Sequence, residues 1–248
     1  MLGSNYSVNL KYLTAADKYD RGDPMFNPAY YAFKILCRKH IQRPVCRVAL
    51  GLFVAYSMAS HADYKQIIDE GFWTSVYPNG GNTFYCETYF SKHSPILTVS
   101  HIYPTTWISK TLECRSERSC LRSNQHYQKI LSDLHNMVPV ESIYHFKLKD
   151  SIFGNLDTSI DKNECNIKKR YHIIEPPDTV KGDVARIHFY MHKQYNLPLN
   201  SSSLFLKTWS KEDPPSKEEI EKNRKIKEIQ GNENPFISNP DLVDQLEF

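Results

Sequence analysis

The stretch Val99-Ser100-His101-Ile102-Tyr103-Pro104 decides the fold, together with Asp133-Leu134-His135-Asn136-Met137-Val138-Pro139 about thirty residues later. Residues 96–100 combine apolar and β-branched side chains, which favours a strand that ends at His101. The second stretch carries short polar side chains of the kind that hydrogen bond to nearby backbone groups. We therefore predict a strand that delivers His101 and a polar segment that orients the hairpin beside it.

The rest of the pattern predicts an α+β fold that is mostly helical. Apolar residues recur at helical spacing in three segments, residues 63–76, 123–134 and 181–195. Residues 216–230 form a charged helix in this interpretation, with Ser216 and Glu219 as its cap and Gly231 as its end. Strand patterns are few, and residues 83–90 give the clearest one. With 40% hydrophobic residues, the chain can build a sizeable core.

Charge is distributed unevenly along the chain. Residues 1–62 hold eight of the 31 Lys and Arg residues but three of the 28 Asp and Glu residues. Residues 63–248 therefore carry 23 basic and 25 acidic residues, a net charge of −2. A positive field over the whole molecule would not hold nucleic acid, so binding would need a local basic patch.

Residues 37–62 have the order of regions found in a signal peptide. Basic residues precede an apolar run at 48–58, and Ala59-Ser60-His61-Ala62 then offers a small-x-small cleavage pattern. The apolar run is shorter than the roughly 20 residues that span a bilayer. We expect residues 1–62 to be absent from the mature protein, which would occupy residues 63–248 and have no membrane segment. The alternative for residues 48–58 is a buried core helix.

The cysteines agree with export. Cys86, Cys114, Cys120 and Cys165 follow the predicted cleavage site, and an even number suits two disulfides in an oxidising compartment. Four cysteines allow three pairings, of which we favour Cys114–Cys120 with Cys86–Cys165. A zinc site is the rival interpretation, although no two of these cysteines have the close spacing of a zinc ribbon.

Further motifs accompany the two opening stretches in a fixed order: Thr83-Phe84-Tyr85-Cys86, Arg186, Tyr190-Met191 and residues 230–236. Together they resemble the bacterial endonuclease I family over about residues 63–240. The resemblance implies a single domain around a ββα-metal (His-Me finger) core and a periplasmic or secreted nuclease. In that family the histidine corresponding to His101 is the general base. A preceding Glu and a helix Asn hold a divalent metal, and an Arg near the disulfide loop contacts phosphate.

This chain departs from the family at both metal-ligand positions. Ser100 replaces the Glu, and His145 replaces the Asn. A neutral hydroxyl is a poor ligand for Mg²⁺, which favours carboxylates, and imidazole suits transition metals better. The two substitutions together predict a rebuilt site.

We expect an endonuclease that needs no metal and favours RNA, with His101 as general base and His145 as general acid. The ribose 2′-OH suits this scheme because it is an intramolecular nucleophile that needs no metal-activated water. One alternative is a metal-dependent nuclease acting on DNA and RNA, with Mg²⁺ or a transition metal. The other is an inactive relative that binds nucleic acid. We expect RNA, and also DNA, as binding partners of a monomer.

The remaining candidate residues support the substrate or the hairpin. Arg118 is the first candidate for the phosphate-contacting arginine, with Arg115 and Arg122 as alternatives. The other substrate-binding candidates are Ser100, Tyr144, Lys147 and Lys149. Asp133, His135 and Asn136 are expected to orient the hairpin, with a supporting role behind His101 as the alternative.

Overall fold

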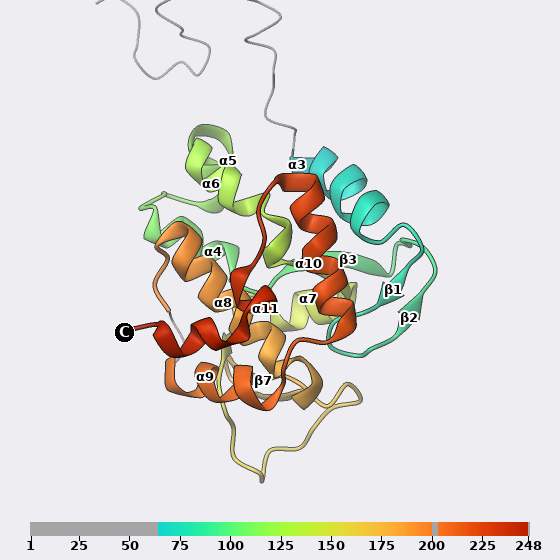
Figure 1. Ribbon diagram of the computed structural model, residues 1–248, viewed down its shortest axis with the longest axis vertical. Coiled ribbons are helices and arrows are strands. Elements are labelled where there is room, and N and C mark those ends of the chain that lie inside the picture. The colour runs from blue at the N-terminus through green and yellow to red at the C-terminus, as the bar shows by residue number, and fades with distance from the viewer. Residues whose placement is uncertain (1–63, 200–202, 248) are drawn as a thin grey trace, which may run out of the picture. The chain divides into compact units, whose positions relative to one another are not determined.

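The computed structural model describes residues 64–199 and 203–247, which belong to one unit (Figure 1). The predicted signal peptide falls outside the described residues. Helices dominate the described part: α3 (Tyr64–Gln66), η3 (Ile67–Val76), α4 (Thr105–Thr111), α5 (Glu117–Ser123), α6 (Gln125–Leu131), η4 (Leu134–Asn136), α7 (Ser142–Leu148), η5 (Asp178–Val180), α8 (Lys181–Tyr195), α9 (Ser203–Glu212), α10 (Lys217–Gln230), α11 (Pro235–Ser238) and η6 (Pro240–Gln245). The strands are short: β1 (Gly81–Asn82), β2 (Tyr89–Phe90), β3 (Leu97–His101), β4 (Met137–Glu141), β5 (Ile152–Phe153), β6 (Lys168–Arg170) and β7 (Ile173–Glu175). The predicted α+β class, mostly helical, is confirmed.

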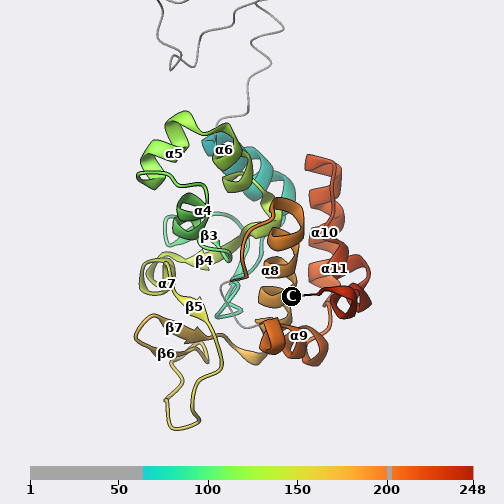
Figure 2. The same ribbon diagram turned by 90° about the vertical axis from the view of Figure 1, so that its left-hand side faces the viewer.

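A strand–strand–helix unit forms the centre of the candidate site. Strands β3 and β4 pair antiparallel, with Ser100 opposite Val138 and His101 opposite Met137. Helix α7 begins at the residue that follows β4, so the chain turns directly from the hairpin into the helix. In Figure 2, β3, β4 and α7 lie on one side of α8, while α10 and α11 lie on its other side.

Helix α8 is buried along most of its length, and its bounds agree with the predicted residues 181–195. Arg186, in its middle, is fully buried and forms a bidentate ion pair with Glu219 of α10, at 2.9 Å from Nε and 2.6 Å from Nη2. Asp183 accepts a further hydrogen bond from Arg186 at 2.8 Å. Because a buried charge is costly without partners, this network fixes α10 against α8.

Local capping accounts for the bounds of α10. Ser216 accepts a hydrogen bond from the backbone N–H of Glu219, and Gly231 ends the helix at a φ of 85°. Lys222 of α10 donates from Nζ to the carbonyl of Met137 at 2.7 Å, which ties the helix to β4.

The structure differs from the sequence prediction in two places. Residues 83–90 were expected as one strand, but within them only β2 is a strand, and it pairs with β1, which lies just before residue 83. Between them the N–H of Thr83 bonds to the carbonyl of Thr88, and the N–H of Phe84 bonds to the carbonyl of Pro139, so the segment turns. Helix α5 was not predicted from the sequence, and its N-terminus has a capping box between Ser116 and Ser119.

The cysteines pair as favoured from the sequence. Cys86 joins Cys165 with a Cα–Cα distance of 4.5 Å, and Cys114 joins Cys120 at 5.6 Å. The second bridge closes the loop that leads into α5. Arg118 lies on that helix, between the two bridged cysteines. Nowhere in residues 64–199 and 203–247 is a helix long and apolar enough to cross a bilayer.

Candidate active site

His101 ends β3 and lies half-buried at the wall of a cleft. Its Nε2 lies 2.9 Å from the carbonyl oxygen of Leu131. A carbonyl only accepts hydrogen bonds, so the proton of the neutral ring sits on Nε2 and the lone pair on Nδ1. Burial is the largest cause that lowers the pKa of His101 to about 4; the neighbouring His145 acts in the same direction, and the hydrogen bond to Leu131 opposes it. At neutral pH the ring is therefore neutral and able to accept a proton.

His145 lies on α7 and reaches back to the strand that carries His101. Its Nδ1 lies 3.3 Å from the Oγ of Ser100. Burial lowers the pKa of His145, and Lys149 lowers it further. With Nδ1 held at Ser100, Nε2 is the ring atom available for proton transfer.

A cleft of about 570 Å³ runs past these two histidines. Elements η3, β3, α5, α6 and α7 contribute to its walls, and Arg118 and Lys149 add two exposed positive charges. A smaller hollow adjoins it and also contains His101, His145 and Lys149, together with Ser100. The structure therefore brings both histidines, Ser100, Arg118 and Lys149 to one site.

Glu117, which was not among the residues predicted for the site, also lines the cleft. It accepts a hydrogen bond from the hydroxyl of Thr105 and lies 3.9 Å from the Nζ of Lys149. Its carboxylate thus offsets part of the local positive charge. Its position beside Arg118 on the cysteine-bridged helix was the one available signal.

Two predicted substrate-binding residues lie elsewhere. Tyr144 was expected to contact substrate, but it is 4% exposed, packs in the core and donates its hydroxyl proton to Glu164. The prediction is wrong because Tyr144 lies on the buried face of α7, one residue before His145. Lys147 does not line the cleft, and its Nζ lies 5.6 Å from the ring centroid of Tyr144.

The residues of the Asp-Leu-His-Asn segment are buried and hydrogen-bonded within the fold. Asn136 clamps the backbone of Tyr103 from both sides, accepting from its N–H at 2.7 Å and donating to its carbonyl at 3.0 Å. His135 bonds through Nε2 to the carbonyl of Asn232 at 3.1 Å. These contacts support the structural interpretation, because they fix the chain just after His101.

Asp133 lies at the centre of the same network. Its Oδ2 accepts hydrogen bonds from the hydroxyls of Tyr190 and Tyr195, both at 2.6 Å. Its Oδ1 accepts from the backbone N–H of His135 and from the Nε2 of Gln230. The carboxylate also raises the pKa of His101 slightly against the larger effect of burial, so it acts on the site through charge as well as through the fold.

The residues present do not fit the magnesium site that the family resemblance implies. At the two ligand positions stand a hydroxyl and an imidazole, and these groups lie within hydrogen-bonding distance of each other. Magnesium favours oxygen ligands, carboxylates above all, and neither position supplies a carboxylate. In the described part of the chain, no three His, Cys, Asp or Glu side chains are grouped to hold a metal.

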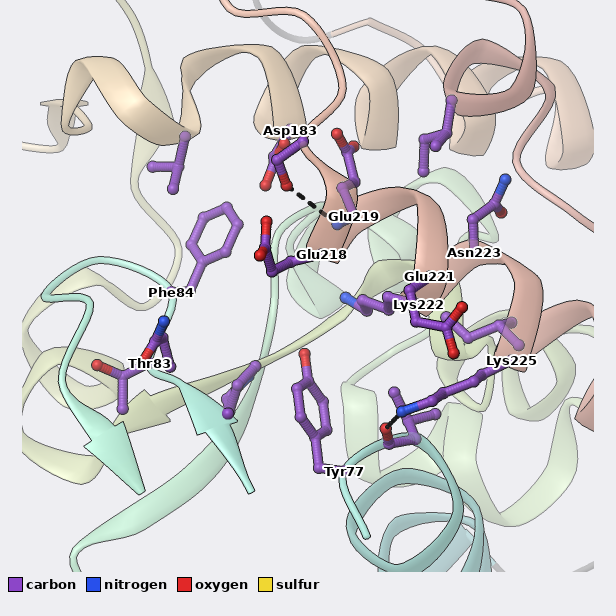
Figure 3. A pocket seen from close by; sticks show the side chains of 18 of the residues that line it. Tyr77, Thr83, Phe84, Asp183, Glu218, Glu219, Glu221, Lys222, Asn223 and Lys225 are labelled. Carbon is purple, nitrogen blue, oxygen red and sulfur yellow. Dashed lines mark hydrogen bonds between the residues drawn. The ribbon is translucent and has the colours of Figure 1, made fainter. Parts of the chain in front are cut away.

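A second cleft, of about 580 Å³, lies between α8, α10 and the β1–β2 segment (Figure 3). Its acidic lining residues outnumber its two lysines, Lys222 and Lys225: Glu87, Asp183, Glu218, Glu219 and Glu221. Figure 3 shows Asp183 and Glu219 meeting at the wall formed by α8 and α10. Such a surface repels phosphate groups, so the histidine cleft is the better nucleic-acid site.

Relatives of this chain are named as nucleases. The chain is similar to Endonuclease-1 of Buchnera aphidicola subsp. Acyrthosiphon pisum (strain APS), at 32% identity over 55% of this chain and 57% of the relative. It is 29% identical to a periplasmic deoxyribonuclease of Aeromonas hydrophila over 55% of this chain and 61% of that protein. It is 35% identical to an extracellular ribonuclease of Bacillus subtilis (strain 168) over 46% of each chain. The chain thus spans about half to three-fifths of these relatives.

The family model named Endonuclease I matches residues 54–241. This match covers most of the chain and includes the β3–β4–α7 unit, both disulfides and the buried Asp133 network. The chain belongs to the endonuclease I family.

Proposed function

We propose that this chain is a secreted or periplasmic endonuclease that cleaves RNA in preference to DNA and needs no metal ion. The mature enzyme comprises residues 63–248 and acts as a monomer. Family membership supports the nuclease activity, and relatives named as periplasmic or extracellular nucleases support the location. The relative named as an extracellular ribonuclease supports RNA as substrate.

The observation that carries the proposal is the contact between Ser100 and His145. Both of the family's metal-ligand positions have changed here, and the two new side chains lie within hydrogen-bonding distance of each other. A decayed site would not require the new pair to match. The pair instead holds an imidazole beside His101, so that the cleft contains a proton acceptor and a proton donor.

The reaction on RNA would use these two rings in opposite roles. Nδ1 of His101 takes the proton from the ribose 2′-OH as the 2′-oxygen attacks phosphorus. The bond from phosphorus to the 5′-oxygen breaks, and Nε2 of protonated His145 donates a proton to that leaving oxygen. The products are a 2′,3′-cyclic phosphate and a 5′-hydroxyl. Each positioned imidazole would contribute about 10²–10⁴-fold to the rate.

Arg118 and Lys149 supply positive charge for the phosphate. Both line the cleft with the histidines. Arginine can hold two phosphate oxygens at once through its planar fork, whereas lysine acts as a point charge. Their positive charges stabilise the negative charge that builds up on the phosphate oxygens in the transition state.

Incubation of the purified protein with single-stranded RNA and with plasmid DNA, each with and without EDTA, tests the proposal. RNA cleavage that persists in EDTA supports the two-histidine mechanism. Cleavage that EDTA abolishes would overturn metal independence, and no cleavage under any condition would leave only the nucleic-acid-binding alternative.

A metal-dependent nuclease that cleaves DNA is the second candidate. The relatives named as deoxyribonucleases favour it. On this alternative His145 would bind a transition metal, because imidazole suits such ions. EDTA sensitivity that is restored by a transition metal but not by Mg²⁺ would identify it.

A further inference from the structure

Helix α7 exposes large apolar side chains beside the candidate active site. Phe146 is 77% exposed and Ile143, one turn earlier, is 56% exposed. The N–H of Ser142 bonds to the carbonyl of Ile96 at 2.8 Å, which brings a third exposed apolar residue, 72% accessible, to the start of the helix. Exposed apolar surface at a site of this kind indicates a binding face, because covering that surface with a ligand lowers the free energy.

Phe146 adjoins the proposed general acid directly. Its ring lies edge-on to the ring of His145, with centroids 5.5 Å apart and an interplanar angle of 78°. His145 lines the cleft, and Phe146 follows it toward solvent. The exposed phenyl ring therefore lies next to the ring that is proposed to act at the scissile phosphate.

We infer that Phe146 is a nucleobase subsite, on which a base next to the scissile phosphate stacks. This inference rests on the proposed function and adds a substrate class to it: single-stranded nucleic acid. Every nucleobase has an aromatic face, so stacking on Phe146 works without reading the sequence. The neighbouring charges favour a nucleotide over an apolar protein segment, since Lys147 and Lys149 both lie within three residues and both are exposed.

Stacking on Phe146 selects for single strands. A base inside a duplex is already stacked between its neighbours and paired with its partner strand. To reach an outside ring it would have to leave the helix, at a cost in stacking and pairing free energy. A base in a single strand meets no such cost, so the subsite binds single-stranded substrates more tightly than duplexes.

Binding of a fluorescent RNA separates this inference from the proposed chemistry. The probe is a single-stranded RNA hexamer with one 2-aminopurine, whose fluorescence falls when the base stacks. The full-chain protein carries His101→Ala, so the probe is not cleaved. We expect binding to quench the fluorescence, and Phe146→Ala in this background to remove the quenching and weaken binding about 5- to 150-fold, as loss of one base–aromatic stack does.

The control variants isolate the aromatic face. Phe146→Trp keeps a flat ring and should retain the quenching. Leu204→Ala removes another exposed apolar residue, 75% accessible and outside the cleft, and should change neither signal. Thermal melts by circular dichroism should be equal for all variants, because these side chains contribute little packing.

The outcomes are distinct. Unchanged quenching and affinity in Phe146→Ala would overturn the subsite and leave the apolar face of α7 to a protein partner. If Phe146→Ala lowered the affinity for the single-stranded hexamer and for the same hexamer paired in a duplex by the same factor, single-strand selection would be overturned. Failure of the proposed function is seen separately, as a protein with His101 intact that quenches the probe but never cleaves it.

Discussion

The Oγ of Ser100 lies 3.3 Å from the Nδ1 of His145, which joins the last-but-one residue of β3 to the middle of α7. The family resemblance implies a metal at these two positions. Here their side chains lie within hydrogen-bonding distance of each other, so the contact joins the hairpin to the helix.

Replacement of Ser100 tests the positioning of His145. Ser100→Ala removes the hydrogen bond to Nδ1, so the ring loses its fixed orientation. We expect kcat on RNA to fall about 10-fold with KM little changed, as for loss of a hydrogen bond to a charged group of about 1.5 kcal/mol. Ser100→Thr keeps the hydroxyl and should retain most of the activity, whereas an unaffected Ser100→Ala would show that Ser100 does not position His145.

The double variant Ser100→Glu with His145→Asn restores the ligand set implied by the family. We expect its activity to become dependent on Mg²⁺ and sensitive to EDTA, because a carboxylate and an amide oxygen suit that ion. Calorimetric titration with Mg²⁺ should show binding by the double variant only. Activity of the double variant in EDTA would contradict the assignment of these positions.

The pH dependence of kcat/KM reports the protonation states of both imidazole rings. His101 must be neutral, so activity rises with pH through its pKa of about 4. His145 must be protonated, so activity falls as pH rises through a pKa that burial lowers below 6.5. We expect a bell-shaped profile on RNA with its maximum between about pH 4 and pH 6.5. His145→Ala should lose the alkaline limb, and a profile that keeps rising above pH 7 would contradict the two-histidine mechanism.

The two disulfides should have different effects. The Cys86–Cys165 bridge closes a chain segment of 79 residues, and its removal with paired Ser substitutions should lower stability by about 4 kcal/mol. The Cys114–Cys120 bridge spans six residues, so its removal should cost only about 2 kcal/mol. Removal of the Cys114–Cys120 bridge should also raise KM for RNA, because the bridged segment places Arg118 at the cleft. Urea unfolding and steady-state kinetics measure both effects.

Replacement of Arg186 tests the buried ion network. Arg186→Met leaves Glu219 and Asp183 without their shared cation in a buried site, which should cost about 3–5 kcal/mol. Arg224 provides the matched control, because it pairs with Glu221 and Glu228 on the surface of α10 at 54% exposure of its side chain. Arg224→Met should leave the urea midpoint nearly unchanged, because solvent screens a surface ion pair.

Some elements were predictable because their determinants are local. The apolar spacing of residues 181–195 and the Ser216 cap of α10 lie within the segments that they define, and the structure has both helices at those bounds. Residues 83–90 were misread as a strand because they are rich in aromatic residues and threonine, which are typical of strands. Long-range contacts decided otherwise: Thr83 donates to Glu141 and Phe84 bonds to Pro139.

The candidate site shows the same division. The sequence by itself determined the family and the strand that ends at His101, because both are marked by short motifs. Only the tertiary structure decided that Ser100 faces His145, that Tyr144 is buried while Phe146 is exposed, and that Glu117 enters the cleft. A helix of seven residues does not reveal its buried face from its own residue types, since packing against the hairpin determines that face.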